Sequence, residues 1–174
     1  MDAQESKNRV EALLFSADEP LSIEKLRAHS RASTKQVREA LSELAREYDE
    51  QGRAFELKEV AGGYQLYTRK EYSEVVARLH KGRRASRLSR PALETLAVIA
   101  FRQPVTKAVI ESVRGVNVDG VVSTLLERNL IQVLGRAKQL GGPLLYGTTK
   151  QFLRYFHLKN LNELPRVGEL KGMG

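Results

Sequence analysis

Apolar residues recur at intervals of three and four in one stretch of each half of the chain. The first stretch is RVEALLFSA (residues 9–17) and the second is PALETLAVIAF (residues 91–101). This spacing places the apolar side chains on one face of an α-helix, so both stretches are predicted to be helices that pack on a core. A similar order of helix and strand patterns follows each stretch, which indicates an internal repeat.

The repeat is clearest where residues 19–41 and 103–125 align without a gap. In each copy a hydroxyl residue, Ser22 or Thr106, precedes an apolar helical pattern. Such a hydroxyl accepts a hydrogen bond from a backbone N–H group that the first turn of a helix leaves unpaired. A helix is therefore predicted to start after each of these two residues.

A further helix is predicted in each copy. Ser33 and Gln36 have the spacing of a capping box, and Asn117 is the predicted cap in the second copy. Gly115 is expected to end the preceding helix, because glycine adopts the left-handed conformation readily. Gly120 is expected to let another segment approach the backbone closely.

Two strand-like runs follow these helices in each half. The four runs are AFELKEV, YQLYT, LIQVLGR and PLLYG. Gly62 and Gly63 give a two-residue hairpin signal in the first half, and a longer loop containing glycine separates the runs in the second half. Tyr146 is expected to seal the second hairpin against the helices.

A last helix is predicted after each hairpin. The predicted capping boxes run from Thr68 to Glu71 and from Thr148 to Gln151, and an apolar stripe follows each of them. The order helix, helix, helix, hairpin, helix therefore occurs twice, which is the order of a winged helix.

The predicted fold class is mainly α with small β hairpins (α+β), arranged as tandem winged-helix, or helix-turn-helix, domains. The expected limits are 1–80 for the N-terminal domain, 81–88 for a basic linker, 89–165 for the C-terminal domain and 166–174 for a flexible tail.

The formal net charge of +8 is unevenly distributed along the 174 residues. Residues 1–80 contain 13 Lys and Arg against 15 Asp and Glu, whereas residues 81–90 contain five basic residues and no acidic one. A basic excess in one part of a chain indicates a polyanionic partner for that part, although a solvated linker is an equal alternative.

Weak, sequence-independent contact with DNA would use basic residues outside the helices. The candidate phosphate-backbone contacts are Lys81, Arg83, Arg84, Arg87, Arg90, Arg136 and Lys138. Base reading is less favoured, because Asp119 and Glu127 lie on the outward face of the second recognition helix, and Glu39, Glu43 and Glu47 interrupt the first.

The second half closely resembles the segregation and condensation protein B family, ScpB. The resemblance rests on LETLAVIAFRQPVTKAVIESVRGVNVDGVVSTLLERNLIQVLGR and on GGPLLYGTTKQFLRYFHLKNLNELP, and more loosely on VEALLFSADEPLSIEKL and GGYQL in the first half. It implies a homodimer of tandem winged helices that binds the kleisin ScpA. Through that kleisin it would act with the SMC ATPase in chromosome condensation and segregation.

Partner binding needs apolar surface, and the helix from Val118 has a wide apolar arc. Val122 and Leu126 are the candidate partner contacts, with core packing as the alternative for both.

Enzymatic motifs are absent from the sequence, so no catalytic residue, cofactor or metal site is expected. There is no P-loop, nucleophile elbow or zinc-binding helix motif, and there is no cysteine. No apolar run approaches the ~20 residues of a membrane span, so a cytoplasmic protein is expected. The resemblance to ScpB implies that it is also nucleoid-associated. The alternative function is a winged-helix transcription regulator, which would bind a defined operator tightly.

Overall fold

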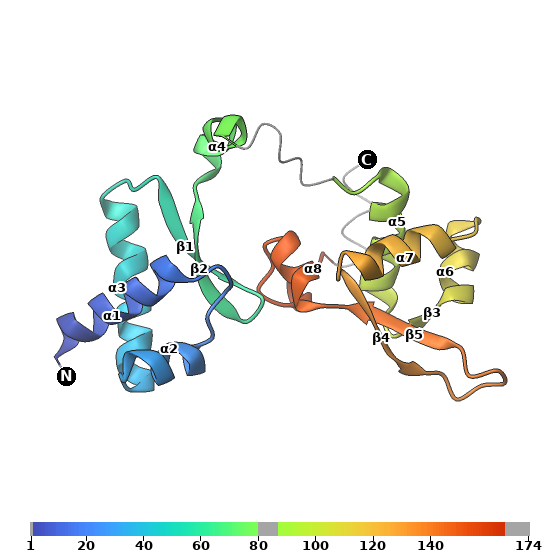
Figure 1. Ribbon diagram of the computed structural model, residues 1–174, viewed down its shortest axis with the longest axis horizontal. Coiled ribbons are helices and arrows are strands. Elements are labelled where there is room, and N and C mark those ends of the chain that lie inside the picture. Colours follow the sequence, from blue (N-terminus) through green and yellow to red (C-terminus); the bar gives the residue numbers. More distant parts are fainter. Residues whose placement is uncertain (1, 80–86, 166–174) are drawn as a thin grey trace. The chain divides into compact units, whose positions relative to one another are not determined.

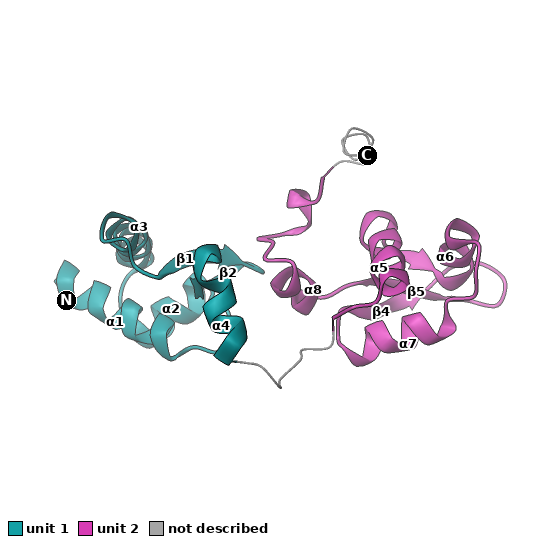
Figure 2. Cartoon of the chain, turned by 90° about the horizontal axis from the view of Figure 1, so that it is seen from above, with its two compact units in different colours: residues 1–84 teal, residues 85–174 magenta. Residues whose placement is uncertain are grey.

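The computed structural model describes residues 2–79 and 87–165 (Figure 1). The chain divides into two compact units, Met1–Arg84 and Ala85–Gly174 (Figure 2). Each unit has its own hydrophobic core, and each contains three helices, a β hairpin and a further short helix.

The first unit follows the predicted order of elements. They are α1 (Ala3–Ser16), α2 (Ile23–Ser30), α3 (Thr34–Glu50), β1 (Phe55–Val60), β2 (Gly63–Thr68), the 3-10 helix η1 (Lys70–Tyr72) and α4 (Ser73–Leu79). The hydroxyl of Ser22 caps α2 by accepting from the Lys25 N–H at 3.3 Å. Ser33 and Gln36 form both bonds of the capping box that starts α3.

The hairpin turn lies one residue earlier than the glycine pair suggests. Ala61 and Gly62 form the turn with φ values of 52° and 75°, and Gly63 is already in β2, opposite Val60. A Cβ atom on Gly63 would lie 2.9 Å from a backbone carbon of Leu21. Gly63 is therefore needed for close packing rather than for the turn.

The core of the first unit lies between α1, α2, α3 and one face of the hairpin. Its fully buried side chains include Val10, Leu14, Leu26, Val37 and Leu44. A polar seam joins α1 to α3 beside this core. In it, the Lys7 ammonium lies 2.6 Å from Glu47 and 3.4 Å from Glu43.

The second unit repeats this order and adds a short strand. Its elements are α5 (Arg90–Arg102), β3 (Val105–Thr106), α6 (Lys107–Arg114), α7 (Asp119–Glu127), β4 (Ile131–Arg136), β5 (Leu144–Thr148), α8 (Lys150–Tyr155) and the 3-10 helix η2 (Leu161–Glu163). The sheet order is β3-β5-β4, with antiparallel pairs. Tyr146 on the central strand pairs with Val105 and Val133 and is buried in the core.

The turn between α6 and α7 is held by side chains as well as by glycine. Gly115 ends α6 with φ at 69°. Asn117 was expected to cap α7, but Val118 occupies the cap position. The Asn117 Oδ1 accepts a hydrogen bond from the Asp119 N–H at 3.0 Å. The Val118 N–H donates instead to Glu111 at 3.3 Å.

Gly120 does not have the expected role. A Cβ atom at this position would meet nothing within 4 Å, so no segment approaches this backbone closely. The position lies on the solvent side of the first turn of α7, where any small residue has room.

The two late capping boxes also differ from expectation. Thr149, not Thr148, caps α8 by accepting from the Phe152 N–H at 3.2 Å. No side chain caps η1, and Thr68 is the last residue of β2. Thr148 belongs to β5, one residue beyond the predicted run PLLYG, whereas β2 ends at Thr68 as the run YQLYT does.

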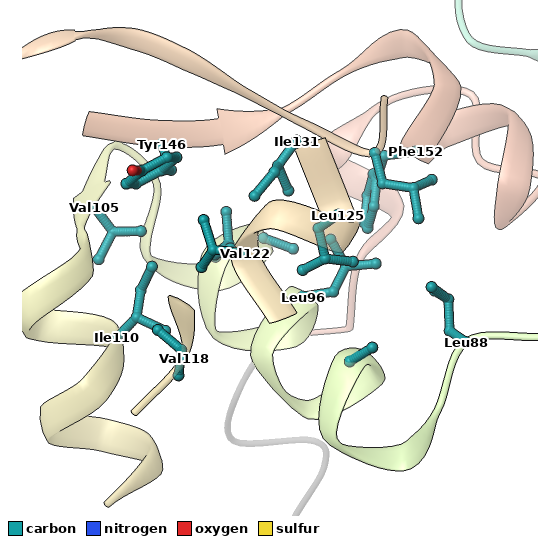
Figure 3. Packing of buried hydrophobic residues seen from close by; sticks show 14 residues of the cluster. Leu88, Leu96, Val105, Ile110, Val118, Val122, Leu125, Ile131, Tyr146 and Phe152 are labelled. Carbon is teal, nitrogen blue, oxygen red and sulfur yellow. The ribbon is translucent and has the colours of Figure 1, made fainter. Parts of the chain in front are cut away.

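The core of the second unit is larger than that of the first (Figure 3). Leu96 from α5, Ile110 from α6, Leu125 from α7 and Ile131 at the start of β4 all belong to this cluster. These side chains fix the three helices against the sheet, so that the outer faces of α5 and α6 keep a defined shape.

Candidate partner-binding surfaces

An apolar groove runs along the outer side of α5 in the second unit. It has a volume of about 320 Å³. Its lining residues are Leu93, Leu96, Ala97, Ala100, Phe101, Phe152, Phe156, Leu158, Leu164 and Pro165. All of them are apolar, so the groove suits an apolar segment of another molecule.

One wall of the groove is a row of residues four positions apart on α5. Leu93, Ala97 and Phe101 lie on the same side of the helix because four residues make slightly more than one turn. Leu93 and Phe101 are exposed, whereas the neighbouring row of Leu96 and Ala100 is buried in the core.

The opposite wall comes from α8 and the segment after it. Phe152 is buried, and its ring centroid lies 5.0 Å from that of Phe156, which is exposed. The exposed ring of Tyr155 lies outside the lining and packs against Phe156 at 5.0 Å in an edge-to-face arrangement. Aromatic rings of this kind often anchor protein interfaces.

The side chain of Gln103 connects the two walls. Gln103 follows α5, and its Oε1 accepts from the Thr148 N–H at 2.8 Å and from the Thr148 hydroxyl at 3.1 Å. Its Nε2 donates to the Ala100 carbonyl at 3.1 Å. Because Thr148 directly precedes the cap of α8, these bonds tie the end of α5 to the start of the other wall.

The elements around the groove are basic. Arg90 and Arg102 on α5, with Lys150, Arg154 and Lys159 on the other wall, outnumber the acids Glu94 and Glu163. This balance favours an apolar partner segment with acidic flanks.

A second apolar surface covers the outside of α6. Ile110 is the only fully buried residue of this helix, and Val109, Val113 and Val116 are exposed in a row. Val109 also lines a shallow depression beside Val105 and Leu145. This surface is flatter and has no aromatic anchor, so the groove beside α5 is the stronger candidate.

Of the two partner contacts expected from the sequence, the structure exposes one. Val122 is 4% exposed and belongs to the core, so its assignment as a partner contact is wrong. It points inward because Val118, Val122 and Leu125 form the inner row of α7. Leu126 is 36% exposed and stays a candidate contact.

The candidate phosphate contacts do not form one described patch. Lys81, Arg83 and Arg84 lie outside the described residues. Arg87 and Arg90 lie at the start of α5, whereas Arg136 and Lys138 lie at the β4–β5 loop, at a different end of the second unit (Figures 1 and 2). Two of these residues have partners. Arg90 forms an ion pair with Glu94 at 3.0 Å, and Arg136 donates to the Gly142 carbonyl at 2.9 Å.

The recognition helices offer few groups to DNA bases. Gln36 accepts from the Ser33 N–H within the capping box. Two acids of α3 have a partner within the first unit, because Glu43 and Glu47 bind Lys7 on α1.

Ion pairs fix the helix-turn-helix of the second unit. Hydrogen bonds from Arg90 and Arg114 lower the pKa of Glu94. Arg114 reaches Glu94 at 2.5 Å, and its Nε donates to the buried Thr95 hydroxyl at 3.2 Å. The Lys107 ammonium, 2.5 Å away, lowers the pKa of Asp119 at the start of α7. These groups hold α5, α6 and α7 together.

No group of three metal-ligating side chains occurs within residues 2–79 and 87–165. In the same part of the chain no helix is long and apolar enough to cross a membrane.

Comparison with known proteins gives a match along nearly the whole chain. The family described as Segregation and condensation complex subunit ScpB matches residues 8–167. Segregation and condensation protein B of Syntrophotalea carbinolica is 48% identical over 169 residues, which cover 97% of this chain and 85% of the relative. The chain belongs to the ScpB family. As a member, it is a subunit of a segregation and condensation complex.

Two solved ScpB structures are also similar in sequence. ScpB from Mycobacterium tuberculosis is 38% identical, with coverage of 90% of this chain and 97% of that chain and a TM-score of 0.45. A dimer of the ScpB N-terminal domain complexed with an ScpA peptide is 31% identical, with coverage of 44% and 95% and a TM-score of 0.41. The predicted family and α+β fold class are confirmed for this ScpB-family chain.

The groove beside α5 was not predicted from the sequence. The sequence does contain an indication of it, because Leu93, Ala97 and Phe101 widen the apolar arc of α5 beyond the row that the core needs. The sequence alone did not show that α8 would stand opposite this arc.

Proposed function

We propose that this ScpB-family chain is a non-enzymatic adaptor that acts as a homodimer and binds the kleisin ScpA. Through ScpA it joins the SMC ATPase and takes part in chromosome condensation and segregation in the cytoplasm, at the nucleoid. The observation that carries the proposal is the 48% identity to a segregation and condensation protein B over 97% of the chain.

The groove between α5 and α8 is the surface that we propose for the kleisin. An amphipathic helix can place its apolar face in such a groove, with anchors one turn apart. The row of Leu93, Ala97 and Phe101 has this spacing, and the basic surroundings favour acidic flanks on the kleisin segment. Contact with DNA would be weak and independent of sequence, through the basic residues outside the helices.

The proposal is tested by light scattering coupled to size-exclusion chromatography, with the protein alone and mixed with ScpA of the same organism. We expect a dimer that moves to a larger, stoichiometric species. A protein that ignores ScpA, and instead shifts a defined operator fragment at nanomolar concentration, would establish the transcription regulator in its place.

The position of the site is tested with matched surface variants. Leu93→Asp and Phe101→Asp put a carboxylate into the groove and are expected to weaken ScpA binding at least about tenfold, as the loss of an interface anchor does. Val113→Asp on the outside of α6 is the control, since Val113 has similar exposure. Weaker binding of the control alone would move the kleisin site to α6.

A further inference from the structure

The loop between β4 and β5 of the second unit carries a leucine that contacts no core. The loop comprises residues 137–143, at the opposite end of β5 from α8 (Figures 1 and 2). Leu140 in this loop is more exposed than any other large apolar side chain of the described residues. A single exposed leucine is common on protein surfaces, so its meaning depends on what surrounds it.

Hydrogen bonds across its base give the loop a defined shape. The Ala137 N–H donates to the Pro143 carbonyl at 2.9 Å, and the Arg136 guanidinium donates to the Gly142 carbonyl at 2.9 Å. Gly142 has a positive φ of 48°, which turns the chain back shortly after Leu140. The closed base therefore holds Leu140 at the tip.

The charges around the loop have one sign. From residue 128 to residue 162 the sequence contains no Asp or Glu. Its basic residues in this stretch are Arg128, Arg136, Lys138, Lys150, Arg154 and Lys159. Lys138 is exposed and has no hydrogen-bond or ion-pair partner within residues 2–79 and 87–165. A polyanionic partner is therefore favoured for this part of the second unit.

A shallow depression beside the loop provides a second contact for such a partner. It has a volume of about 530 Å³, and its lining includes Ala137 and Gln139 from the loop, Thr106 at the cap of α6 and Arg102 at the end of α5. Arg102 is exposed and, among the described residues, has no ion-pair partner. A phosphate backbone lying in the depression would pass between Arg102 and the loop that carries Lys138.

Double-stranded DNA fits these features better than other polyanions do. Proteins that bind the minor groove combine basic side chains with an apolar wedge, and leucine is one of the residues used. The loop contains no aromatic residue on which unpaired bases could stack, so a single strand is not favoured. One leucine also buries too little apolar surface to anchor a protein in a bilayer.

We infer that the β4–β5 loop binds the minor groove of double-stranded DNA, with Leu140 as the wedge and with Arg102 and Lys138 on the flanking phosphates. This inference rests on the weak DNA contact of the proposed function and assigns its place and its groove. The loop reads no base edge, so the affinity depends on salt rather than on a defined operator. Asp119 and Glu127, which are exposed on α7, stay out of the contact.

The first test reverses charges in the full-length protein. Binding to a labelled duplex of about 30 base pairs is followed by fluorescence anisotropy over a salt series that starts at about 50 mM. Arg102→Glu and Lys138→Glu should each weaken binding at least about threefold, and each should lower the slope of log affinity against log salt by about 0.9. Lys70→Glu, an exposed lysine of the first unit, is the control. Unchanged slopes in both loop variants, or an equal loss in the control, would contradict the inference.

The second test concerns the wedge and the groove. Leu140→Ser should weaken binding about 3- to 30-fold and leave the salt slope unchanged, because it removes apolar contact but no charge. Leu161→Ser, at an exposed leucine of η2, is the control and should bind as the wild type does. Netropsin, which occupies the minor groove of A·T-rich DNA, should displace the wild-type protein from such a duplex, whereas the major-groove ligand methyl green should not. Displacement by methyl green alone would place the contact in the wrong groove.

The outcomes distinguish this inference from the adaptor function. Circular dichroism verifies that each variant is folded, and little loss of stability is expected because the replaced side chains are exposed. Leu140→Ser and Lys138→Glu should still bind ScpA, and if they release it, the loop belongs to the kleisin site and the inference fails. A wild-type protein that binds no duplex at about 50 mM salt would overturn the inference and leave the adaptor intact.

Two further results would also decide the matter. Binding to vesicles with about 30% phosphatidylserine, but not to the duplex, would make the loop a membrane contact and would overturn the inference. A protein that ignores ScpA, and whose loop variants lose affinity for the duplex, would support the inference and overturn the adaptor.

Discussion

Gly63→Ala should destabilise the first unit, although alanine normally suits a strand better than glycine does. The new Cβ atom would lie 2.9 Å from backbone carbons of both Pro20 and Leu21, against an optimal separation of about 3.5–4.0 Å. Neither contact can be relieved by a side-chain rotation. The segment before α2 would have to move away from β2.

That movement stretches two backbone hydrogen bonds between Leu21 and Tyr64, which measure 2.9 and 2.8 Å. Overpacking typically costs about 1–3 kcal/mol, and the stiffer unfolded chain returns about 0.4–1 kcal/mol. We therefore expect a net loss of about 1–2 kcal/mol, or roughly 5–15 °C in the melting temperature of a unit of this size.

Gly120→Ala is the matched control, because its Cβ atom has open space and the position is helical. It should stabilise the second unit by up to about 1 kcal/mol. Differential scanning calorimetry gives the melting temperatures, and hydrogen exchange at the Leu21 and Tyr64 amides reports the local opening. If Gly63→Ala melts with wild-type stability and keeps these amides protected, the backbone of Pro20 and Leu21 leaves room for a methyl group at position 63, and the prediction is wrong.

Three further predictions concern titration and the wing. Burial and a hydrogen bond to a carboxylate raise the pKa of Tyr48, so the folded state holds this proton more tightly than the unfolded chain does. The thermal midpoint of the first unit should therefore fall as the pH rises above about 10, and it should fall less steeply in Tyr48→Phe. The pKa of Glu94 is lowered, so its ionised form stabilises the second unit at neutral pH, and this stabilisation should be lost as the pH falls below about 4. The thermal midpoint of the second unit, measured over a series of acidic pH values, should depend less on pH in Glu94→Gln. Gly147→Ala would place a Cβ atom 2.5 Å from Leu134, so it should lower the melting temperature of the second unit, and an unchanged value would show that Leu134 moves aside freely.

Local chemistry made much of the fold predictable. Ser22, Thr106 and the Ser33–Gln36 box start helices where the sequence indicated, because a cap is decided by residues within one turn of each other. The repeated order of elements followed from these starts and from the apolar spacing.

The errors arose where distant segments decide the outcome. The local sequence allows Gly63 in the turn or in the strand. Its place in the strand is explained by the backbone of Leu21, which packs against it from a distant part of the chain. In the same way, the inner row of α7 includes Val122 only because α5 and the sheet meet that side of the helix. The groove depends on α8 standing opposite α5, which no local pattern specifies.

The bonds of Gln103 have a consequence for how fast a partner binds. They hold the end of α5 against the strand that leads into α8, so the groove already has its width in the free protein. A rigid site loses little conformational entropy on binding, and the cost of ordering then falls on the incoming segment. Gln103→Ala would let the walls drift, and it should slow association with ScpA even though Gln103 does not line the groove.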